Sequence, residues 1–232
     1  MMVGTQGDRE TGKPAMPTLV DVSHQITDGM TTSPGLPTPE VEEAGSGSES
    51  APGTGDAGGR VSLVGATGTY VEMPAHRYRD GADLADLDLE RVAGLPGLVV
   101  DATDRHPIDA RLVEHLDVRD RAVLLHTGWD RHWRTDAYAD PDHPYLEEAA
   151  AKLLVEGGAA LVGIDSVGVD RTAPATEGAR PSLGLLLSAG IPVVRHLRAL
   201  ELLPSEGFRF HAVPAKVRGM AAFPVRAFAV TG

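Results

Sequence analysis

Residues 145–164 have the sequence YLEEAAAKLLVEGGAALVGI, in which two different patterns follow each other. The first twelve positions carry apolar residues at helical spacing, and the pair Gly157-Gly158 is typical of a helix end. The next six residues, 159–164, form a short apolar run of the kind found in buried strands. This stretch therefore predicts a helix over 145–156 that leads directly into a buried strand.

Similar units occur on both sides of this stretch. We expect helices over 109–116 and 182–189, and strands over 18–22, 60–72, 98–102, 122–126, 191–194, 208–213 and 223–230. Strands that alternate with helices predict an α/β fold with a mixed or parallel sheet and flanking helices. The chain has 232 residues, of which 42% are hydrophobic, which is enough for one domain over 17–232. Two small domains are the alternative.

Two segments are too polar to join a core. Residues 1–16 predict a flexible N-terminal tail. Residues 33–60 include SGSESAPGTGDAGG, which cannot bury enough apolar surface to offset the entropy of ordering it. We expect a long flexible loop there, which is either a plain insertion or a lid over a pocket.

The composition excludes several classes of partner. A formal net charge of −12 with scattered Lys and Arg argues against binding to nucleic acid. No apolar run is long enough to span a membrane, and the N-terminus has no apolar core of a signal peptide. Without cysteine there is neither a disulfide nor a thiol nucleophile. We expect a cytoplasmic protein that acts on a small molecule.

Residues 66–76, ATGTYVEMPAH, carry the most informative motif. If they form a strand, alternate side chains place Ala66, Tyr70 and Glu72 on one face, before Pro74 ends the strand ahead of His76. This segment resembles the motif His-x-Gly-Thr-His-x-Asp-x-Pro-x-His of the metal-dependent cyclase and kynurenine formamidase family. The resemblance implies a metal site formed by the first two His and the Asp, and a catalytic role for the last His.

The resemblance covers residues 18–230. It includes TLVDVSHQITDGMTTSPG at 18–35, AVLLHTGWDRHW at 122–133, ALVGIDSVGVD at 160–170, LLLSAGIPVVRHLRALELL at 185–203 and PAKVRGMAAFPVRAFAV at 214–230. It implies the swivelling β/β/α-type fold of the family and a homodimer or higher homo-oligomer. An alignment without gaps also places Leu183 and Arg195 where the family has two further metal ligands, a His and a Glu.

The residues at these positions are poor metal ligands. Zinc and manganese need several convergent ligands from His, Cys, Asp or Glu. Ala66, Leu183 and Arg195 cannot serve, and Tyr70 is a weak ligand at neutral pH, so we expect neither a metal nor another cofactor. Because the family's Asp and Glu meet at one metal ion, we predict that Glu72 and Arg195 form an ion pair at the corresponding place.

Without a metal to activate water, we expect acid–base chemistry. The interpretation is a metal-independent cyclase-family enzyme for ring formation, isomerisation or rearrangement of a small organic metabolite, for example one of polyketide type. His76 is the candidate general acid and base, Glu72 orients it, Tyr70 donates a hydrogen bond, and Arg195 binds a developing oxyanion. Structural roles for His76 and Tyr70 are the alternatives.

Three further residues are candidates for substrate binding: Trp129, Arg180 and Asp165. For Asp165 and Asp170, a role in capping or turn formation is the alternative. Five other histidines show no ligand spacing with one another, and we expect them at the surface or satisfied in the core: His126, His132, His143, His196 and His211. Two other functions stay open, a catalytically inactive ligand- or partner-binding pseudoenzyme and a metal-dependent amide or lactone hydrolase of the kynurenine formamidase type.

Overall fold

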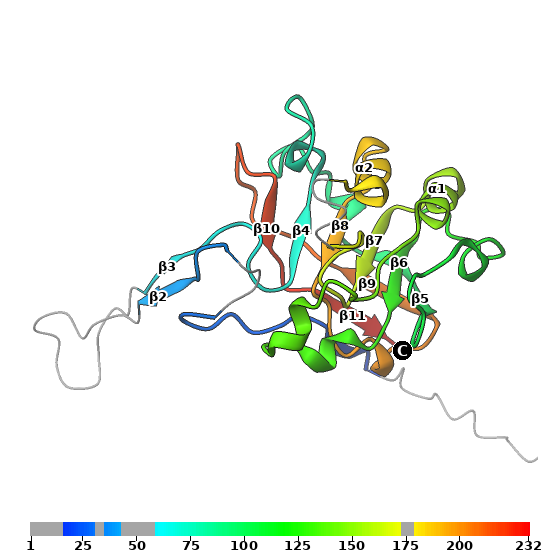
Figure 1. Cartoon of the computed structure of the whole chain (residues 1–232), viewed down its shortest axis with the longest axis horizontal. Helices are drawn as coiled ribbons and strands as arrows, with labels where there is room; N and C mark the ends of the chain where they lie inside the picture. The colour runs from blue at the N-terminus through cyan, green and yellow to red at the C-terminus, as the bar shows by residue number, and fades with distance from the viewer. Residues whose placement is uncertain (1–15, 31–34, 43–58, 173–178) are drawn as a thin grey trace, which may run out of the picture.

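The computed structural model describes residues 16–30, 35–42, 59–172 and 179–232. Most of the expected N-terminal tail and much of the expected 33–60 loop lie outside these residues. One part of that loop is described, and there the prediction was wrong. Glu40–Glu42 forms a short strand, β2, that pairs with β3, Arg60–Ser62, in an antiparallel ribbon (Figure 1).

The described part of the chain contains a nine-stranded mixed sheet with the order β1-β11-β9-β5-β6-β7-β8-β4-β10. Strands β5 to β8 are parallel to one another, and the other pairings are antiparallel. The strands are β1 Thr18–Asp21, β4 Tyr70–Glu72, β5 Leu95–Asp101, β6 Ala122–His126, β7 Leu161–Ile164, β8 Val193–Arg195, β9 Glu206–His211, β10 Ala222–Pro224 and β11 Phe228–Thr231.

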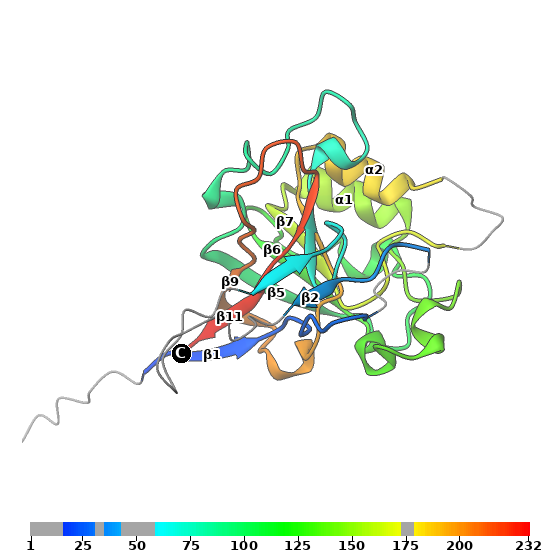
Figure 2. The same ribbon diagram turned by 90° about the vertical axis from the view of Figure 1, so that its left-hand side faces the viewer.

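Two α-helices cover one face of the parallel strands (Figures 1 and 2). They are α1, Glu148–Gly157, and α2, Pro181–Ser188. Helix α1 ends at Gly158, whose φ of 77° is in the left-handed region that glycine adopts without steric cost. The described 3-10 helices are η1 Pro74–His76, η2 Leu89–Arg91, η3 Ala110–Leu112, η4 Trp129–His132, η5 Asp136–Ala139 and η7 Leu200–Leu202.

The core has two layers because side chains of a strand alternate between its faces. On β6, Val123 and Leu125 belong to the core cluster that contains the helix residues, and Ala122 and Leu124 belong to a second cluster that also includes residues of β9 and β4. All four are fully buried. The predicted α/β fold with a mixed sheet and flanking helices is therefore confirmed.

Three local predictions were wrong. The expected helix over 109–116 contains only the single 3-10 turn η3, because Asp109 accepts a hydrogen bond from the backbone N of Arg111 and the chain then turns. The expected strand over 60–72 is split into β3 and β4 by a turn that includes Gly68 at a φ of 63°. The expected strand over 223–230 is likewise two strands, β10 and β11.

Among the described residues, no helix has the length and apolar character needed to cross a membrane.

Candidate active site

The predicted ion pair between Glu72 and Arg195 is confirmed. Strands β4 and β8 are antiparallel neighbours, so that Tyr70 lies opposite Arg195 and Glu72 lies opposite Val193. The Oε2 atom of Glu72 is 2.6 Å from Nε of Arg195, and the side chains are only 1% and 8% exposed. These two atoms are not aligned as in an ideal hydrogen bond, so the attraction is mainly one of charge. Although burial opposes the charged form, the Glu72 carboxylate raises the pKa of Arg195.

The other oxygen of Glu72 faces His76. Its Oε1 atom is 3.2 Å from Nε2 of His76, which lies at the end of η1, directly after β4. The His76 side chain is 41% exposed, whereas Glu72 is buried. One buried carboxylate thus orients a solvent-accessible imidazole and a buried guanidinium, and the structure brings together three of the residues proposed from the motif.

Tyr70 lies beside this pair. It is buried, and the guanidinium carbon of Arg195 is 5.9 Å from the centroid of its ring. Burial raises the pKa of Tyr70, and the positive charge of Arg195 offsets this only in part. The phenol therefore stays protonated at physiological pH and can donate a hydrogen bond.

The residues present do not suit a divalent metal ion. The described residues include no group of three His, Cys, Asp or Glu side chains that could hold one. Leu183 is buried in α2, and the fixed positive charge of Arg195 is in contact with Glu72, the one possible ligand that the motif retains. A divalent cation at this carboxylate would be repelled by the guanidinium.

Asp165 is buried against the turn that follows β6, at Thr127 and Gly128. Its carboxylate accepts hydrogen bonds from the backbone N and Oγ1 of Thr127 and from the backbone N of Gly128. Burial, partly offset by these bonds, raises the pKa of Asp165 to about 6. Both oxygens are engaged by the protein, so the arrangement favours turn formation over the substrate contact proposed as a role for this residue.

Asp170 has a similar structural role, as the capping alternative predicted. Its two oxygens accept hydrogen bonds from the backbone N atoms of Ser182 and Leu183, in the first turn of α2. Arg180 immediately precedes this helix and is half-buried. The charge of Arg180 acts on Tyr70, so the structure places this candidate near the ion pair.

Trp129 is held by the chain that follows it. Its Nε1 atom donates to the carbonyl oxygen of Tyr138 at 3.0 Å, and its ring lies 4.6 Å from that of His132. This contact fixes the turn after β6. It leaves the predicted substrate contact of Trp129 without direct support.

Sequence reasoning missed two histidines near the ion pair, His143 and His196. Both are fully buried, and each has an Nε2 atom without a hydrogen-bond partner in the described part of the chain. Burial, followed by the positive charge of Arg195, lowers the pKa of His196, and the same two influences lower that of His143. The sequence offered one signal, the position of His196 directly after Arg195. Nothing in it pointed to His143.

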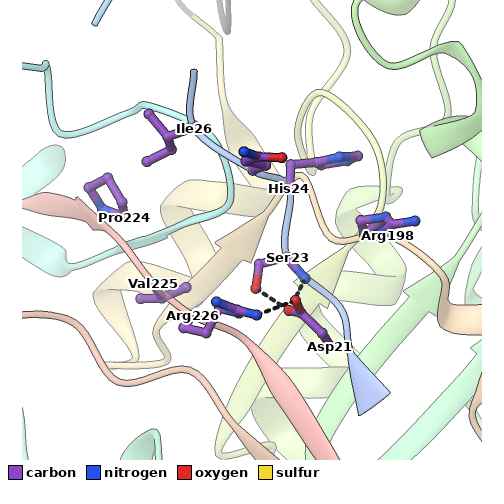
Figure 3. Close-up of a pocket in the computed structure, with 9 residues that line it drawn as sticks. Asp21, Ser23, His24, Ile26, Arg198, Pro224, Val225 and Arg226 are labelled. Carbon is purple, nitrogen blue, oxygen red and sulfur yellow. Dashed lines mark hydrogen bonds and ion pairs between the residues drawn. The ribbon is translucent and has the colours of Figure 1, made fainter. Parts of the chain in front are cut away.

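A surface pocket is lined by the end of β1 and the segment after it, by Arg198 and by the residues around the end of β10 (Figure 3). Its volume is about 620 Å³, and its lining includes His24, Arg198 and the ion pair of Asp21 with Arg226, whose N–O distance is 2.7 Å. The ring of His24 stacks on Trp133 at 3.9 Å, and Trp133 contacts His196 at 5.4 Å. A row of aromatic rings therefore connects the pocket wall to the buried site.

Comparisons with known proteins agree with this architecture. The family model described as "Putative cyclase" matches residues 20–171. The chain is 30% identical over 175 residues to a kynurenine formamidase of Salinibacter ruber, with 73% of this chain and 77% of that protein covered. A kynurenine formamidase of Bacillus cereus is 27% identical over 210 residues, covering 90% of this chain and 95% of that protein. The structure of isatin hydrolase A from Ralstonia solanacearum superposes with a TM-score of 0.80 at 21% identity, covering 93% and 92% of the two chains, which shows a shared fold.

Proposed function

Because this chain belongs to the cyclase family, we propose that it is an enzyme that acts on a small carbonyl compound by acid–base chemistry without a metal ion. The expected outcome of the reaction is ring formation, isomerisation or rearrangement. The observation that carries the proposal is the ion pair of Glu72 and Arg195, which puts a guanidinium at a position where the family motif has a metal ligand. A substrate from polyketide-type metabolism and a homodimer or higher homo-oligomer remain part of the proposal by analogy with the family.

The geometry supports a proton-transfer cycle. The Glu72 carboxylate accepts from Nε2–H of His76, which leaves the lone pair of the neutral ring on Nδ1. Nδ1 of His76 takes a proton from a carbon next to the substrate carbonyl, and the electrons of the C–H bond form an enolate. Arg195 and the phenol of Tyr70 stabilise the enolate oxygen, while Glu72 stabilises the imidazolium form of His76. Return of the proton to another atom of the enolate completes an isomerisation. Attack of the enolate carbon on a second carbonyl of the same molecule closes a ring, and His76 then protonates the resulting alkoxide.

Hydrolysis is the second candidate, and the relatives favour it. The similar proteins are named kynurenine formamidase and isatin hydrolase, and both names describe hydrolysis of a carbon–nitrogen bond next to a carbonyl group. In this chain, His76 would have to act as the base that activates water. A pseudoenzyme that only binds a ligand is the third candidate.

Deuterium exchange at the acidic carbon of ethyl 2-methylacetoacetate, followed by NMR in D2O with a chelator present, tests the proposal. The protein should accelerate the exchange, and His76→Asn should reduce the acceleration about 100-fold or more, the usual contribution of a general acid or base. Acceleration that survives in the His76→Asn variant would exclude the proposed role.

Two controls separate the alternatives. His115→Asn changes a histidine whose side chain is 87% exposed and should leave the exchange unaltered. Hydrolysis of isatin or of the formamide of kynurenine, measured with and without added Zn²⁺ or Mn²⁺, tests the second candidate. Hydrolysis that requires the added metal would contradict the metal-independent proposal, and absence of both activities would favour the pseudoenzyme.

A further inference from the structure

His196 has a backbone conformation that is unusual for a residue other than glycine. It directly follows Arg195, the last residue of β8, and its φ angle of 54° lies in the left-handed region. A side chain with a Cβ atom is sterically disfavoured in this region. Glycine would form the same turn without this cost, so the turn alone does not explain the histidine.

The imidazole of His196 is also unfavourable to bury. The residue is fully buried, and its Nε2 atom has no hydrogen-bond partner among the described residues. A buried polar atom without a partner destabilises the folded state. Two unfavourable features at one residue point to a role other than stability, because such features persist where the surrounding structure uses them for function.

The side chain of His196 is held in place by two aromatic residues. The hydroxyl oxygen of Tyr138 is 2.8 Å from Nδ1 of His196. Tyr138 is itself buried, and its ring lies 4.9 Å from the ring of Trp133. The ring of Trp133 in turn lies 5.4 Å from that of His196. The imidazole therefore has a fixed orientation.

Further contacts of His196 reach Tyr70 and the residue before it. The ring centroids of His196 and Tyr70 are 5.4 Å apart, with an angle of 36° between the ring planes. The carbonyl oxygen of His196 accepts a hydrogen bond from Oγ1 of Thr69 at 2.5 Å. In the pairing of β4 with β8, Tyr70 lies opposite Arg195. His196 thus contacts the Tyr70 ring through its side chain and binds the preceding residue through its main chain.

We propose that His196 is a positioning residue that holds the phenol of Tyr70 beside Arg195 and keeps its hydroxyl directed at the enolate oxygen. The inference rests on the proposed function, in which Tyr70 donates a hydrogen bond to this oxygen. Tyr138 fixes the imidazole, and the imidazole fixes the phenol ring. His196 itself exchanges no proton with the substrate. A displacement of about 1 Å can slow a reaction about 100-fold, so a residue that acts by contact alone can control the rate.

The orientation of Tyr70 can be measured without substrate. In the full-length protein labelled with 3-fluorotyrosine, the ¹⁹F NMR signals of Tyr70 are assigned by their absence in Tyr70→Phe. They should shift or broaden in His196→Asn and in Tyr138→Phe, because the ring gains freedom. Asparagine is tolerated in the left-handed region, so His196→Asn removes the ring contact without adding backbone strain. Unchanged Tyr70 signals in both variants would overturn the inference.

The kinetic test separates positioning from a merely structural role. In the exchange of ethyl 2-methylacetoacetate, His196→Asn and Tyr138→Phe should lower kcat by about 10-fold or more and leave KM unchanged, because the enolate oxygen is stabilised mainly in the transition state. In a Tyr70→Phe background, His196→Asn should cause little further loss, because the hydroxyl that it positions is absent. An equal loss in both backgrounds would overturn the inference.

A matched control removes a tyrosine hydroxyl elsewhere. Tyr145→Phe changes a half-buried tyrosine in the loop before α1 and should leave kcat unaltered. The circular dichroism spectra of all variants should match that of the wild type.

The outcomes separate this inference from the function on which it rests. If the wild type accelerates exchange through His76 and His196→Asn is equally fast, the positioning role is wrong and the proposed function stands. If the wild type itself fails to accelerate exchange, the proposed function fails and the positioning role fails with it. Altered Tyr70 signals, a lower kcat at constant KM and no further loss in the Tyr70→Phe background together support the inference.

Discussion

Glu72 and Arg195 form a buried ion pair across the antiparallel strands β4 and β8, with 2.6 Å between Oε2 and Nε. Both side chains are almost completely removed from water. Burying two charges carries a large desolvation cost that their attraction offsets only when both are present. The pair is therefore weak evidence for stability, and its value to the protein lies in fixing a cation beside His76.

Removal of one partner should destabilise the fold. Glu72→Gln leaves the charge of Arg195 buried without a counter-ion, and we expect the free energy of unfolding to fall by about 3–5 kcal/mol. The double variant Glu72→Leu, Arg195→Met removes both charges and should recover most of this loss. Urea denaturation of the wild type, of the single variants Glu72→Leu and Arg195→Met and of the double variant measures the interaction energy between the two side chains. Additive losses in the double variant would contradict a direct interaction.

Restoring the ligands of the family motif should create a metal site. The combined substitutions Ala66→His, Tyr70→His, Glu72→Asp, Leu183→His and Arg195→Glu supply the ligand types that zinc and manganese prefer. We expect this variant to retain about one equivalent of metal after dialysis, measured by elemental analysis, and the wild type to retain almost none. A matched variant that keeps Arg195 should bind far more weakly. Stoichiometric metal in the wild type would refute the interpretation of the site.

The stability of the protein should depend on the protonation of His24. Burial, aided by the positive charge of Arg198, lowers the pKa of His24 from 6.5 to about 4. The unfolded chain therefore binds a proton first, and the stabilisation present above pH 6.5 is lost as the pH falls towards 4. His24→Phe keeps a ring stacked on Trp133 and should flatten this dependence, as measured by urea denaturation between pH 4 and pH 7.

Other buried groups also contribute to the pH dependence of the free energy of unfolding. The role of His24 is therefore measured by comparing the pH dependence of the wild type with that of His24→Phe. The lowered pKa values of His143 and His196 act in the same direction as that of His24. Asp165 acts in the opposite direction, because its pKa is raised from 3.8 to about 6 and its stabilisation is lost as the pH rises through that range. An unchanged slope in His24→Phe would show that His24 does not titrate in this way.

Helix α2 should depend on Asp170. The carboxylate accepts hydrogen bonds from two backbone N atoms of the first turn, and the N-cap residue Arg180 provides none from its side chain. Asp170→Ala should lower the free energy of unfolding by about 2 kcal/mol, at the upper end of capping effects because the site is buried. Asp170→Asn, with one acceptor oxygen, should lie between the two. Thermal unfolding by circular dichroism measures the order of the three proteins.

Local patterns predicted the regular parts of the fold well. The apolar spacing and the glycine pair predicted α1, and the run AVLLH predicted β6 over the same residues that the structure shows. The helix expected over 109–116 failed although the segment, DARLVEHL, contains several strong helix formers, because eight residues are too few to nucleate a helix on their own. The backbone of Ile108 is instead tied to Tyr145 and Glu147, which directs the chain into a turn.

The sequence by itself determined that the ligands of the family motif are replaced and that Glu72 and Arg195 would meet, because both positions belong to motifs that converge on one point. The sequence also identified His76 as the candidate general acid and base, because this residue keeps its place in the motif. Only the tertiary structure decided that His143 and His196 are buried where the positive charge of Arg195 lowers the pKa of both. His143 is in a loop, and it contacts Ser166 in the segment after β7, in which Gly168 lies against Arg195. Contacts of this kind join segments with no shared pattern, so no periodicity or spacing in the chain predicts them.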